Sequence, residues 1–279
     1  MQGNRRRPLA DITRDEVSPL AAAIAEQDRR TIDMVRLALD QGRLRLAYQP
    51  VVLGSDPLRV AFHEGLIRVL DPTGRAIPAR DFIGAVEVTE IGRQIDCAAL
   101  EIGLAALAAH PMLRLAVNMS ARSIGYPRWR RVLKRGLGAH PTVGERLILE
   151  ITESSAMLVP EIVTTFMDEL QAEGVAFALD DFGSGYTSFR HLRDFCFDIL
   201  KIDGQFIRGI ARDSDNQALT QALMSVGRHF DMVTVAESVE TPEDAAWLQM
   251  AGIGAMQGYL FGSPTVRPAW MEEPARRLA

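Results

Sequence analysis

The chain contains 279 residues, of which 47% are hydrophobic and 24% charged, and its 31 Lys and Arg against 36 Asp and Glu give a formal net charge of −5. This composition is typical of an ordinary globular protein, and it excludes collagen-like, disulfide-scaffolded and wholly disordered chains. The net acidity argues against a protein that follows long nucleic acid by electrostatics alone. Binding of an anion would therefore require a local reversal of charge.

The cysteines and the apolar runs bear on the cellular location. Cys97 and Cys196 lack the CxxC spacing of metal or redox sites, so a reducing cytoplasm is expected. The most apolar stretch, residues 97–109, is interrupted by Glu101, and we expect no membrane span. At the N-terminus, arginines are followed by acids rather than by an apolar run, which is not the pattern of a secretory signal.

The chain is expected to form one domain. Residues 1–18 are interpreted as a flexible N-terminal tail and residues 19–279 as one folded domain, because no linker or low-complexity block divides them. A first helix is predicted from Pro19 to Gln41, with apolar residues at helical spacing and a stop at Gly42.

Eight strand-like segments follow, and several are nearly continuous apolar runs, as expected for strands buried on both faces. They cover residues 44–52, 59–70, 113–120, 146–152, 175–182, 197–203, 232–238 and 255–261. The connection between the first two is too short for a helical crossover and predicts an antiparallel hairpin, whereas most later connections can hold helices. This order favours an α/β barrel of the (β/α)₈ type with an irregular start. A doubly wound open sheet is the alternative, but the chain lacks a GxGxxG turn after its first strand.

Polar residues interrupt these strands close to their C-terminal ends, mostly one strand–helix unit apart. They are Glu64, Asn118, Glu150, Asp180, Asp181, Lys201, Asp203, Glu237 and Gln257. In a barrel the C-terminal strand ends converge on a single mouth, so these residues are expected to form one cluster. Each residue alone could cap a helix or pair with a surface charge, but a set at successive strand ends indicates a functional site.

The cluster predicts a site for divalent metal ions. Crowded carboxylates would repel one another unless a cation neutralised them, and oxygen ligands favour Mg²⁺ or Mn²⁺ over zinc. The adjacent Asp180 and Asp181 can both reach one site only if the strand ends there and the chain turns, for which Gly183 and Gly185 are suited. Such a pair could flank two metals about 3.5–4 Å apart, the arrangement that serves in-line phosphoryl displacement.

Lys201, which ends another strand, allows two interpretations. A Schiff-base lysine needs an apolar pocket that lowers its pKa, whereas neighbouring acids should raise that pKa. We therefore expect a charged lysine that orients the attacking water or steadies a phosphate. The histidines are expected to be packed or solvated rather than to bind metal, and His63, next to Glu64 in a strand, should face the opposite side.

Ordered motifs resemble a single family from about Arg43 to Pro268. The motifs are YQPVV (Tyr48–Val52), EGLIR (Glu64–Arg68), NMS (Asn118–Ser120), LEITES (Leu149–Ser154), DDFGSGYTS (Asp180–Ser188), LKID (Leu200–Asp203), AESVET (Ala236–Thr241) and QGYLFG (Gln257–Gly262). Each motif alone is weak. The ordered set is similar to the EAL domain family, whose active members are phosphodiesterases for the bacterial second messenger cyclic di-GMP.

The resemblance implies a fold and a metal centre. The fold is a modified TIM (β/α)₈ barrel with an antiparallel first strand, and the cofactors are two Mg²⁺ or Mn²⁺ ions per active site. Carried over by position, one metal would be held by Glu64, Asn118, Glu150 and Asp180. The second would be held by Asp180, Asp181 and Glu237.

The resemblance also implies the roles of further residues. Lys201 would contact the nucleophilic water, with Glu64 and Glu237 beside it in catalysis, and Glu237 could be either a ligand or a base. Glu153 would anchor the loop that follows Asp181. The dinucleotide and the water would be held by Gln49, Arg68 and Gln257.

Two positions depart from the family pattern. Gly65 replaces the signature alanine, and Ser238 replaces the usual glycine of the E-G-V-E segment. Neither change removes a ligand. Gly65 adds backbone freedom beside Glu64, and Ser238 demands a backbone that tolerates a Cβ, because glycine positions can require φ above zero. We therefore expect tuned rather than abolished activity.

Cyclic di-GMP and a second copy of the chain are the expected partners. In active family members the loop corresponding to residues 182–189 couples dimerisation to metal binding, so a homodimer is expected. The N-terminal 40 or so residues leave no room for a synthase or sensor domain, and a stand-alone EAL protein or an excised domain is expected.

The sequence thus predicts a metal-dependent phosphodiesterase that opens cyclic di-GMP to linear pGpG and lowers the level of the messenger. The alternative is a catalytically silent EAL domain that acts as a cyclic di-GMP receptor or a protein-interaction module. Such domains usually lack one or more of the acids, and none is missing here. A third possibility is an unrelated metal-dependent barrel, such as an aldolase-like enzyme with a Schiff base on Lys201.

Overall fold

The computed structural model describes residues 18–184 and 192–272. The expected N-terminal tail therefore lies outside the described residues except for Ser18, and the loop expected at residues 182–189 is described only as far as Ser184. Within the described ranges, no helix combines the length and the apolar character needed to cross a membrane.

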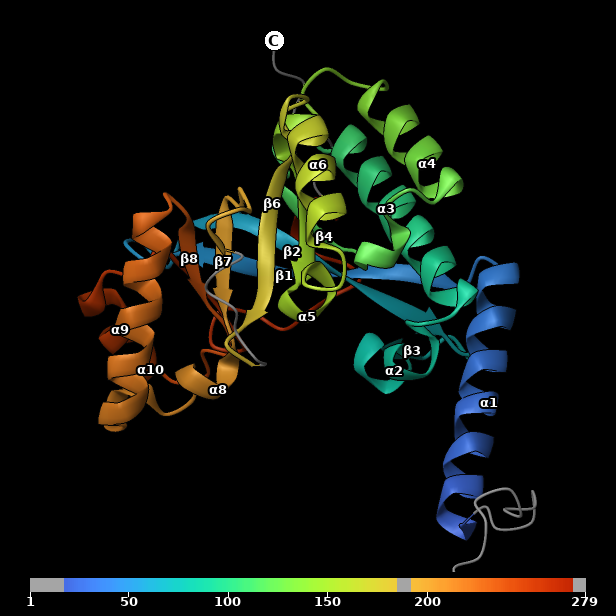
Figure 1. Cartoon of the computed structure of the whole chain (residues 1–279), viewed down its shortest axis with the longest axis horizontal. Helices are drawn as coiled ribbons and strands as arrows, with labels where there is room; N and C mark the ends of the chain where they lie inside the picture. The colour runs from blue at the N-terminus through green and yellow to red at the C-terminus, as the bar shows by residue number, and fades with distance from the viewer. Residues whose placement is uncertain (1–17, 185–191, 273–279) are drawn as a thin grey trace, which may run out of the picture.

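A closed barrel forms the centre of the molecule (Figure 1). Its strands are β1 (Leu44–Leu53), β2 (Val60–Leu70), β4 (Leu115–Asn118), β5 (Leu147–Thr152), β6 (Ala176–Phe182), β7 (Ile199–Ile202), β8 (Val233–Ala236) and β9 (Ala255–Gln257). They are hydrogen-bonded in the order β1-β9-β8-β7-β6-β5-β4-β2, and the β1–β2 pairing closes the ring. A further strand, β3 (Ala76–Pro78), pairs with β2 outside the ring.

Strand β1 runs antiparallel to both of its neighbours, β2 and β9, whereas all the other neighbours in the ring are parallel. The predicted hairpin and the modified TIM barrel with an antiparallel first strand are confirmed. The eight predicted strands are all present. Strand β3 was not predicted, because three residues are too few to show a period of two.

Helices cover the outside of the barrel (Figure 1). They are α1 (Pro19–Asp40), α2 (Ile83–Val86), α3 (Glu90–Ala109), α4 (Pro127–Leu137), α5 (Glu153–Ala156), α6 (Pro160–Gln171), α8 (Gly204–Ile207), α9 (Ser214–His229), α10 (Pro242–Ala251) and α11 (Ala269–Glu272). Short 3₁₀ helices lie at Ala79–Asp81, Ala121–Ser123, Gly144–Arg146 and Ile210–Arg212.

Side chains and glycines at the helix ends explain where the helices start and stop. The Thr89 side chain accepts a hydrogen bond from Ile91 N at 3.2 Å and begins α3. The Asp213 carboxylate begins α9 in the same way, by accepting bonds from two backbone N–H groups of the first turn. Helix α1 ends at Asp40, one residue before the predicted Gln41, and Gly42 then takes a left-handed φ of 64°.

Apolar side chains are buried in two groups. The larger group lies between the barrel and its helices and includes Trp129, whose ring centroid is 5.6 Å from that of Phe166. The smaller group fills the barrel interior with one residue from each strand: Val51, Phe62, Ala116, Ile148, Ala178, Ile199, Val235 and Ala255. We call this second group the apolar layer. This layer fills the barrel interior, so a site inside the barrel is expected beyond it, toward the C-terminal ends of the parallel strands, which form the mouth.

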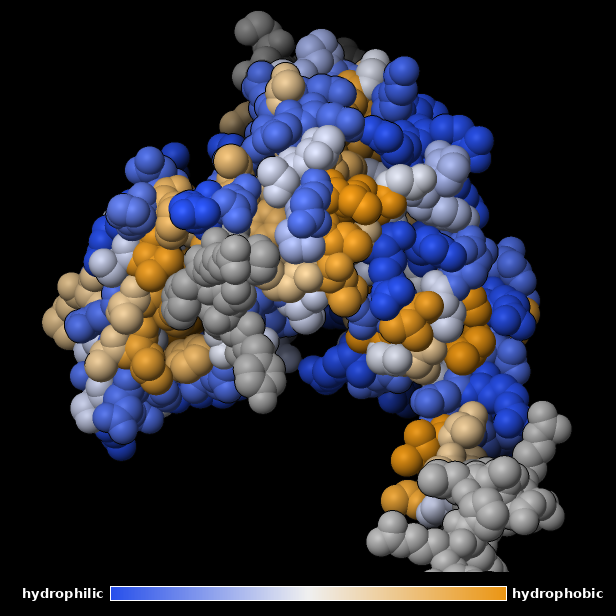
Figure 2. All heavy atoms as spheres, in the orientation of Figure 1, coloured by the Kyte–Doolittle hydropathy of each residue, from blue (hydrophilic) through white to orange (hydrophobic). Residues whose placement is uncertain are grey.

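Helix α1 packs onto the barrel through its second half only. Val35 and Ala38 are fully buried there, whereas Leu20 and Ile24 in the first half are 70% and 54% exposed. Figure 1 shows this first half extending away from the body, and Figure 2 shows apolar atoms on it. The helix is therefore anchored to the barrel by its C-terminal turns.

Candidate active site

A second layer of inward-facing side chains lies above the apolar layer. Side chains of a strand alternate between its two faces, so the next inward position is two residues further on. Two residues beyond the apolar layer, toward the mouth, lie Gln49, Glu64, Asn118, Glu150, Asp180, Lys201, Glu237 and Gln257. We call this set the polar layer. It contains most of the site residues expected from the sequence, and one strand period places them together.

Lys201 lies at the centre of the polar layer, and its side chain is only 1% exposed. Four carboxylates surround its ammonium group. The Nζ atom lies 2.8 Å from Asp180 Oδ1, 2.8 Å from Glu237 Oε1, 3.1 Å from Glu150 Oε2 and 3.4 Å from Glu64 Oε2. One cation is therefore shared by four acids, of which Glu64, Glu150 and Asp180 are buried and Glu237 is partly exposed, and the layer favours further positive charge.

The pKa values of these groups reflect that imbalance. Burial alone would lower the pKa of Lys201, but the four carboxylates raise it well above its ordinary value. Burial raises the pKa of Glu150 and of Glu237 well above the ordinary value, and neighbouring carboxylates add to both rises. Burial also opposes ionisation of Glu64, but Lys201 and two amide side chains outweigh it, so the pKa of Glu64 is lowered.

The amide side chains hold Glu64 at both of its oxygens. Asn118 Nδ2 donates to Glu64 Oε1 at 2.8 Å, and Gln257 Nε2 donates to Glu64 Oε2 at 2.6 Å. Gln257 Nε2 also lies 3.2 Å from Gln49 Oε1, and Gln49 Nε2 donates to the carbonyl oxygen of Gly262 at 3.1 Å. Each carboxylate oxygen of Glu64 thus accepts a hydrogen bond from an amide, which fixes the orientation of the group.

Asp180 and Asp181 reach the same site through a β-bulge. Leu179 pairs with Leu200 and Phe182 with Ile202, so β6 carries one more residue than β7 across this step. Asp181 takes a left-handed φ of 55° in the bulge. The strand ends one residue after this pair, at Phe182, and the chain then turns, with Gly183 at a φ of 93° and Ser184 N donating to the carbonyl oxygen of Asp181 at 3.1 Å. The bulge, which redirects the second side chain, was not predicted.

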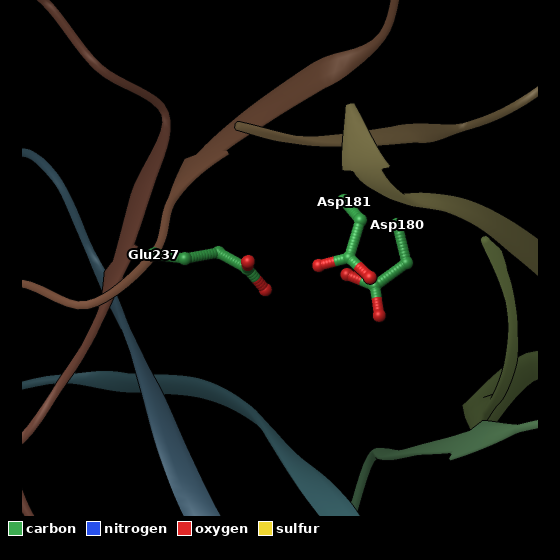
Figure 3. A group of neighbouring side chains, drawn as sticks. All are labelled: Asp180, Asp181 and Glu237. Carbon is green, nitrogen blue, oxygen red and sulfur yellow. The ribbon is translucent and has the colours of Figure 1, made fainter. Parts of the chain in front are cut away.

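These two aspartates face Glu237 (Figure 3). One carboxylate oxygen from each of the three residues lies within 4.8 Å of the other two. Burial and the charge of Asp180 raise the pKa of Asp181 to about 6. Three converging carboxylates form a group that a divalent cation would stabilise.

Glu153 and Asp203 lie near the polar layer but serve the backbone. Glu153 is buried at the start of α5, and its Oε2 accepts a hydrogen bond from Gly183 N at 3.2 Å. It therefore contacts the start of the segment after Asp181, as the resemblance implied. Asp203 begins α8 by accepting a hydrogen bond from Gln205 N at 2.7 Å, so the helix-cap interpretation applies to this residue.

Successive residues of β2 point alternately into the barrel and toward its outer face. His63 faces outward, where its Nε2 accepts a hydrogen bond from Trp270 Nε1 at 3.3 Å. Arg68 lies further along the strand on the face of Glu64, and its Nη1 donates to the carbonyl oxygen of Ile67 at 3.0 Å. Burial and then the charge of Arg80 lower the pKa of Arg68.

A cavity of about 460 Å³ opens above the polar layer. It is lined by Gln49, Glu64, Leu66, Arg80, Asp180, Asp181, Lys201, Arg208, Glu237, Ser238, Glu240, Gln257, Gly258 and Tyr259. Arg68 is not part of this lining among the described residues. Sequence reasoning missed Arg80, Arg208 and Tyr259, which lie in connections after strands or short helices, where no periodic pattern marks the inward direction.

The donor atoms of the site fit hard divalent cations. Among the described residues, Glu150 Oε1 and Gln257 Oε1 are buried without a hydrogen-bond partner. Buried acceptors of this kind are rare unless something else satisfies them. The lining supplies carboxylate and amide oxygens, and its described members include no histidine or cysteine. Such a donor set suits Mg²⁺ or Mn²⁺ rather than zinc.

The two departures noted in the sequence have different structural reasons. A Cβ on Gly65 would lie 3.1 Å from Leu46 Cδ1 and 3.2 Å from the carbonyl oxygen of Ala116, so Leu46 fills the space of the missing methyl group. Ser238 has a left-handed φ of 55°, which explains why glycine suits this position. Both changes lie beside a polar-layer residue and remove no side chain from it.

Comparison with known proteins gives consistent matches. Residues 32–264 match the model of the EAL domain. The bifunctional diguanylate cyclase/cyclic di-GMP phosphodiesterase MucR of Pseudomonas aeruginosa is 33% identical over 247 residues, covering 87% of this chain and 36% of that protein. Cyclic di-GMP phosphodiesterase PdeB of Shewanella oneidensis is 31% identical over 247 residues, covering 87% of this chain and 29% of that protein. The chain thus spans about a third of the length of these relatives.

A solved structure carries the same fold. The PaMucR phosphodiesterase in complex with c-di-GMP is 32% identical and superimposes with a TM-score of 0.73, covering 88% of this chain and 100% of that chain. This likeness covers the whole barrel of the present chain. With the family model matched over most of its length, the chain belongs to the EAL domain family.

Proposed function

We propose that the protein is a metal-dependent phosphodiesterase that hydrolyses cyclic di-GMP to linear pGpG, and so lowers the level of this messenger. The observation that carries the proposal is the complete polar layer, with four acids around Lys201 at the floor of a cavity of about 460 Å³. The names of the relatives MucR and PdeB, which include cyclic di-GMP phosphodiesterase, support the choice of substrate.

Two Mg²⁺ or Mn²⁺ ions would bind among the residues of the polar layer and Asp181. One would be held by Glu64, Asn118, Glu150 and Asp180, and the other by Asp180, Asp181 and Glu237. When bound, such ions polarise a phosphodiester and lower the pKa of water, so that hydroxide is available near neutral pH. The orphaned oxygen of Glu150 and the raised pKa values of Asp181 and Glu237 support these assignments, because each describes a carboxylate that Lys201 alone does not fully satisfy.

Residues of the chain would position the reactants. Lys201 keeps its proton among the acids, so its Nζ can donate a hydrogen bond to the attacking water or to a phosphate oxygen. Gln257 and Asn118 hold the Glu64 carboxylate at both oxygens, which prevents it from rotating away. Gln49 and Arg68 would contact the dinucleotide. Glu237 lies 2.8 Å from Lys201 and close to both aspartates, so it fits the role of ligand as well as that of base.

Glu153 would act on the metal site indirectly. Its hydrogen bond to Gly183 N fixes the residue that follows the bulge, and the bulge in turn places the Asp181 carboxylate. Loss of this bond would let the segment after β6 relax. We also propose that the protein works in the cytoplasm as a homodimer; sedimentation of the purified chain tests the homodimer, and a monomer with full activity would contradict a role for dimerisation.

An end-point assay tests the proposed reaction. Purified protein is incubated with cyclic di-GMP and either Mg²⁺ or Mn²⁺, and pGpG is measured by ion-exchange chromatography. EDTA should abolish the product, and Glu64→Gln should lower the rate by orders of magnitude, whereas Glu161→Gln, at an exposed position of α6, should not. Absence of pGpG with both metals would overturn the proposal, and binding without turnover would favour the receptor.

A further inference from the structure

Ser238 has a backbone conformation that serine rarely adopts. It follows Glu237 directly and has a φ of 55°, one of three positive φ values at non-glycine residues within the described ranges. Its hydroxyl is engaged, because Ser238 Oγ accepts a hydrogen bond from Arg208 Nη2 at 2.9 Å. A strained residue next to a functional one is a reason to ask what its side chain does.

Gly204 leaves the space that the Ser238 side chain fills. A Cβ on Gly204 would lie 2.6 Å from Ser238 Cβ and 2.4 Å from Ser238 Oγ. Gly204 has no left-handed φ, so this contact, rather than its backbone conformation, explains the glycine. The two positions are therefore matched: a side chain at 238 requires none at 204.

Arg208 is the residue that this arrangement holds. It follows α8 directly, and besides its hydrogen bond to Ser238 its Nε lies 3.7 Å from Glu240 Oε1. Both anchors come from the segment after β8, and all three residues line the cavity. The Arg208 side chain is 59% exposed, and within the described part of the chain its Nη1 makes no hydrogen bond. One edge of the guanidinium group is thus open to a ligand.

We propose that Arg208 is a substrate-binding residue that contacts the phosphate of the cyclic dinucleotide that is not cleaved, and that Ser238 is the residue that positions it. The inference rests on the proposed function and adds a second contact region to it. Guanidinium groups bind phosphate through paired hydrogen bonds in a fixed plane. An arginine already held at Nη2 and Nε loses less conformational freedom when it binds.

The placement of Arg208 favours the phosphate outside the reaction centre. The carboxylates that would hold metals surround Lys201, whose side chain is 1% exposed, whereas the Arg208 side chain is 59% exposed at the rim of the same cavity. A cyclic dinucleotide has two phosphodiesters, and only one can lie at the polar layer at a time. The second phosphodiester would lie along the cavity wall, which includes the carboxylate of Glu240, and so needs a cation there.

Steady-state kinetics of Arg208→Gln test the proposal. We expect KM for cyclic di-GMP to rise by about tenfold or more while kcat changes little, because the lost contact is made before and during reaction alike. The affinity for cyclic di-GMP is measured by calorimetry in the presence of Ca²⁺. It should fall by the same factor, and this measurement does not depend on turnover. Arg212→Gln removes an equal charge four residues away, at an exposed position outside the cavity lining, and should leave KM unchanged.

Two further ligands separate phosphate from base contacts. Bis(p-nitrophenyl) phosphate has one phosphodiester and no guanine, so its KM should change far less than that for cyclic di-GMP. The dinucleoside monophosphate GpG has both guanines but only one phosphate. Its inhibition of the hydrolysis of bis(p-nitrophenyl) phosphate should also be nearly independent of Arg208. If GpG inhibition weakens as much as cyclic di-GMP binding does, Arg208 contacts a base and the proposal is wrong.

Ser238 variants test the positioning role. Ser238→Ala keeps the Cβ and removes only the hydroxyl, so it should raise KM for cyclic di-GMP by a smaller factor and leave kcat unchanged. In the Arg208→Gln background the same change should have no further effect, because its partner is gone. An unchanged KM in Arg208→Gln would overturn the proposal while leaving the phosphodiesterase assignment intact. A wild-type protein that binds but does not hydrolyse cyclic di-GMP would overturn only the phosphodiesterase assignment.

Discussion

The Nζ of Lys201 lies 2.8 Å from Oδ1 of Asp180, and this buried ion pair joins one of the chain's two lysines to the aspartate at the start of the β6 bulge. Asp180 is assigned to both proposed metal sites. The lysine and the cations would therefore share a ligand, and the charge on Lys201 should influence both the metals and the substrate.

Lys201→Met should separate these two influences. Loss of the ammonium group should lower kcat for cyclic di-GMP by about 100-fold or more, since a positioned donor is removed. The affinity for Mn²⁺ should rise by about tenfold, because a neighbouring positive charge no longer opposes binding. Calorimetric titration with Mn²⁺ measures the second effect without turnover. Lys134→Met, at the chain's other lysine and exposed on α4, is the control, and an unaltered kcat in Lys201→Met would contradict the role of Lys201.

Metal binding should depend on pH through Asp181. Because the pKa of Asp181 is raised from 3.8 to about 6, the metal-free folded chain binds more protons than the unfolded chain between these values. The contribution of Asp181 to the free energy of unfolding therefore falls as pH rises through this window. Cations compete with that proton, so the increase in Tm on adding Mg²⁺ should be larger at about pH 7.5 than at about pH 5.

Asp181→Asn gives the matched test of this pH dependence. The neutral amide should raise the Tm of the metal-free protein near neutral pH and reduce the difference in the Mg²⁺ effect between the two pH values. Asp28→Asn, on the exposed half of α1, should change neither quantity. A Mg²⁺ effect that is equal at both pH values in the wild type would show that Asp181 does not titrate with the metal.

Gly204 and Ser238 should show strong coupling in a double-mutant cycle. Gly204→Ala alone should destabilise the protein by about 1–3 kcal/mol, because the new methyl group overlaps the Ser238 side chain. Ser238→Gly relieves the left-handed conformation and should be neutral or stabilising by up to about 1 kcal/mol. In the double variant most of the cost of Gly204→Ala should disappear. Urea denaturation measures each term, and additive changes would exclude the contact.

Replacing Gly65 by the signature alanine should not increase the free energy of unfolding. Gly65→Ala places a methyl group 3.1 Å from Leu46 Cδ1 and 3.3 Å from Leu115 Cδ1, so these side chains must move. We expect a loss of about 1 kcal/mol in the free energy of unfolding. Gly84→Ala, where no atom lies within 4 Å of the new methyl group, is the control and should be neutral or slightly stabilising. A gain in stability for Gly65→Ala would mean that Leu46 repacks easily.

The barrel and most of the polar layer could be predicted from the sequence, because both follow from one local rule. Apolar runs mark buried strands, and a polar residue two positions beyond an inward apolar residue must face the same way. Glu64, Asn118 and Glu150 obey this rule without exception along their strands. The loops and helices between the strands play no part in this rule, so the positions of these side chains depend only on strand register.

Other parts of the site depend on contacts that no local pattern encodes. Arg80, Arg208 and Tyr259 reach the cavity from connecting segments, whose paths are set by packing. The match of Gly204 to Ser238 joins residues from two different strand–helix units. The bulge at Asp180 and Asp181 was not predicted, since two adjacent polar residues followed by glycines fit a plain strand end as well as a bulge.

The extra residue of β6 determines which acids could serve the two cations proposed for this site. A regular strand offers the interior every second side chain, so a regular β6 would present Asp180 and turn Asp181 toward the helices. Deleting one residue at the bulge would restore even pairing with β7 and leave the acids for a single ion. In the proposed two-ion site, the place of the second cation would thus depend on the length of one strand, through the single extra residue of β6.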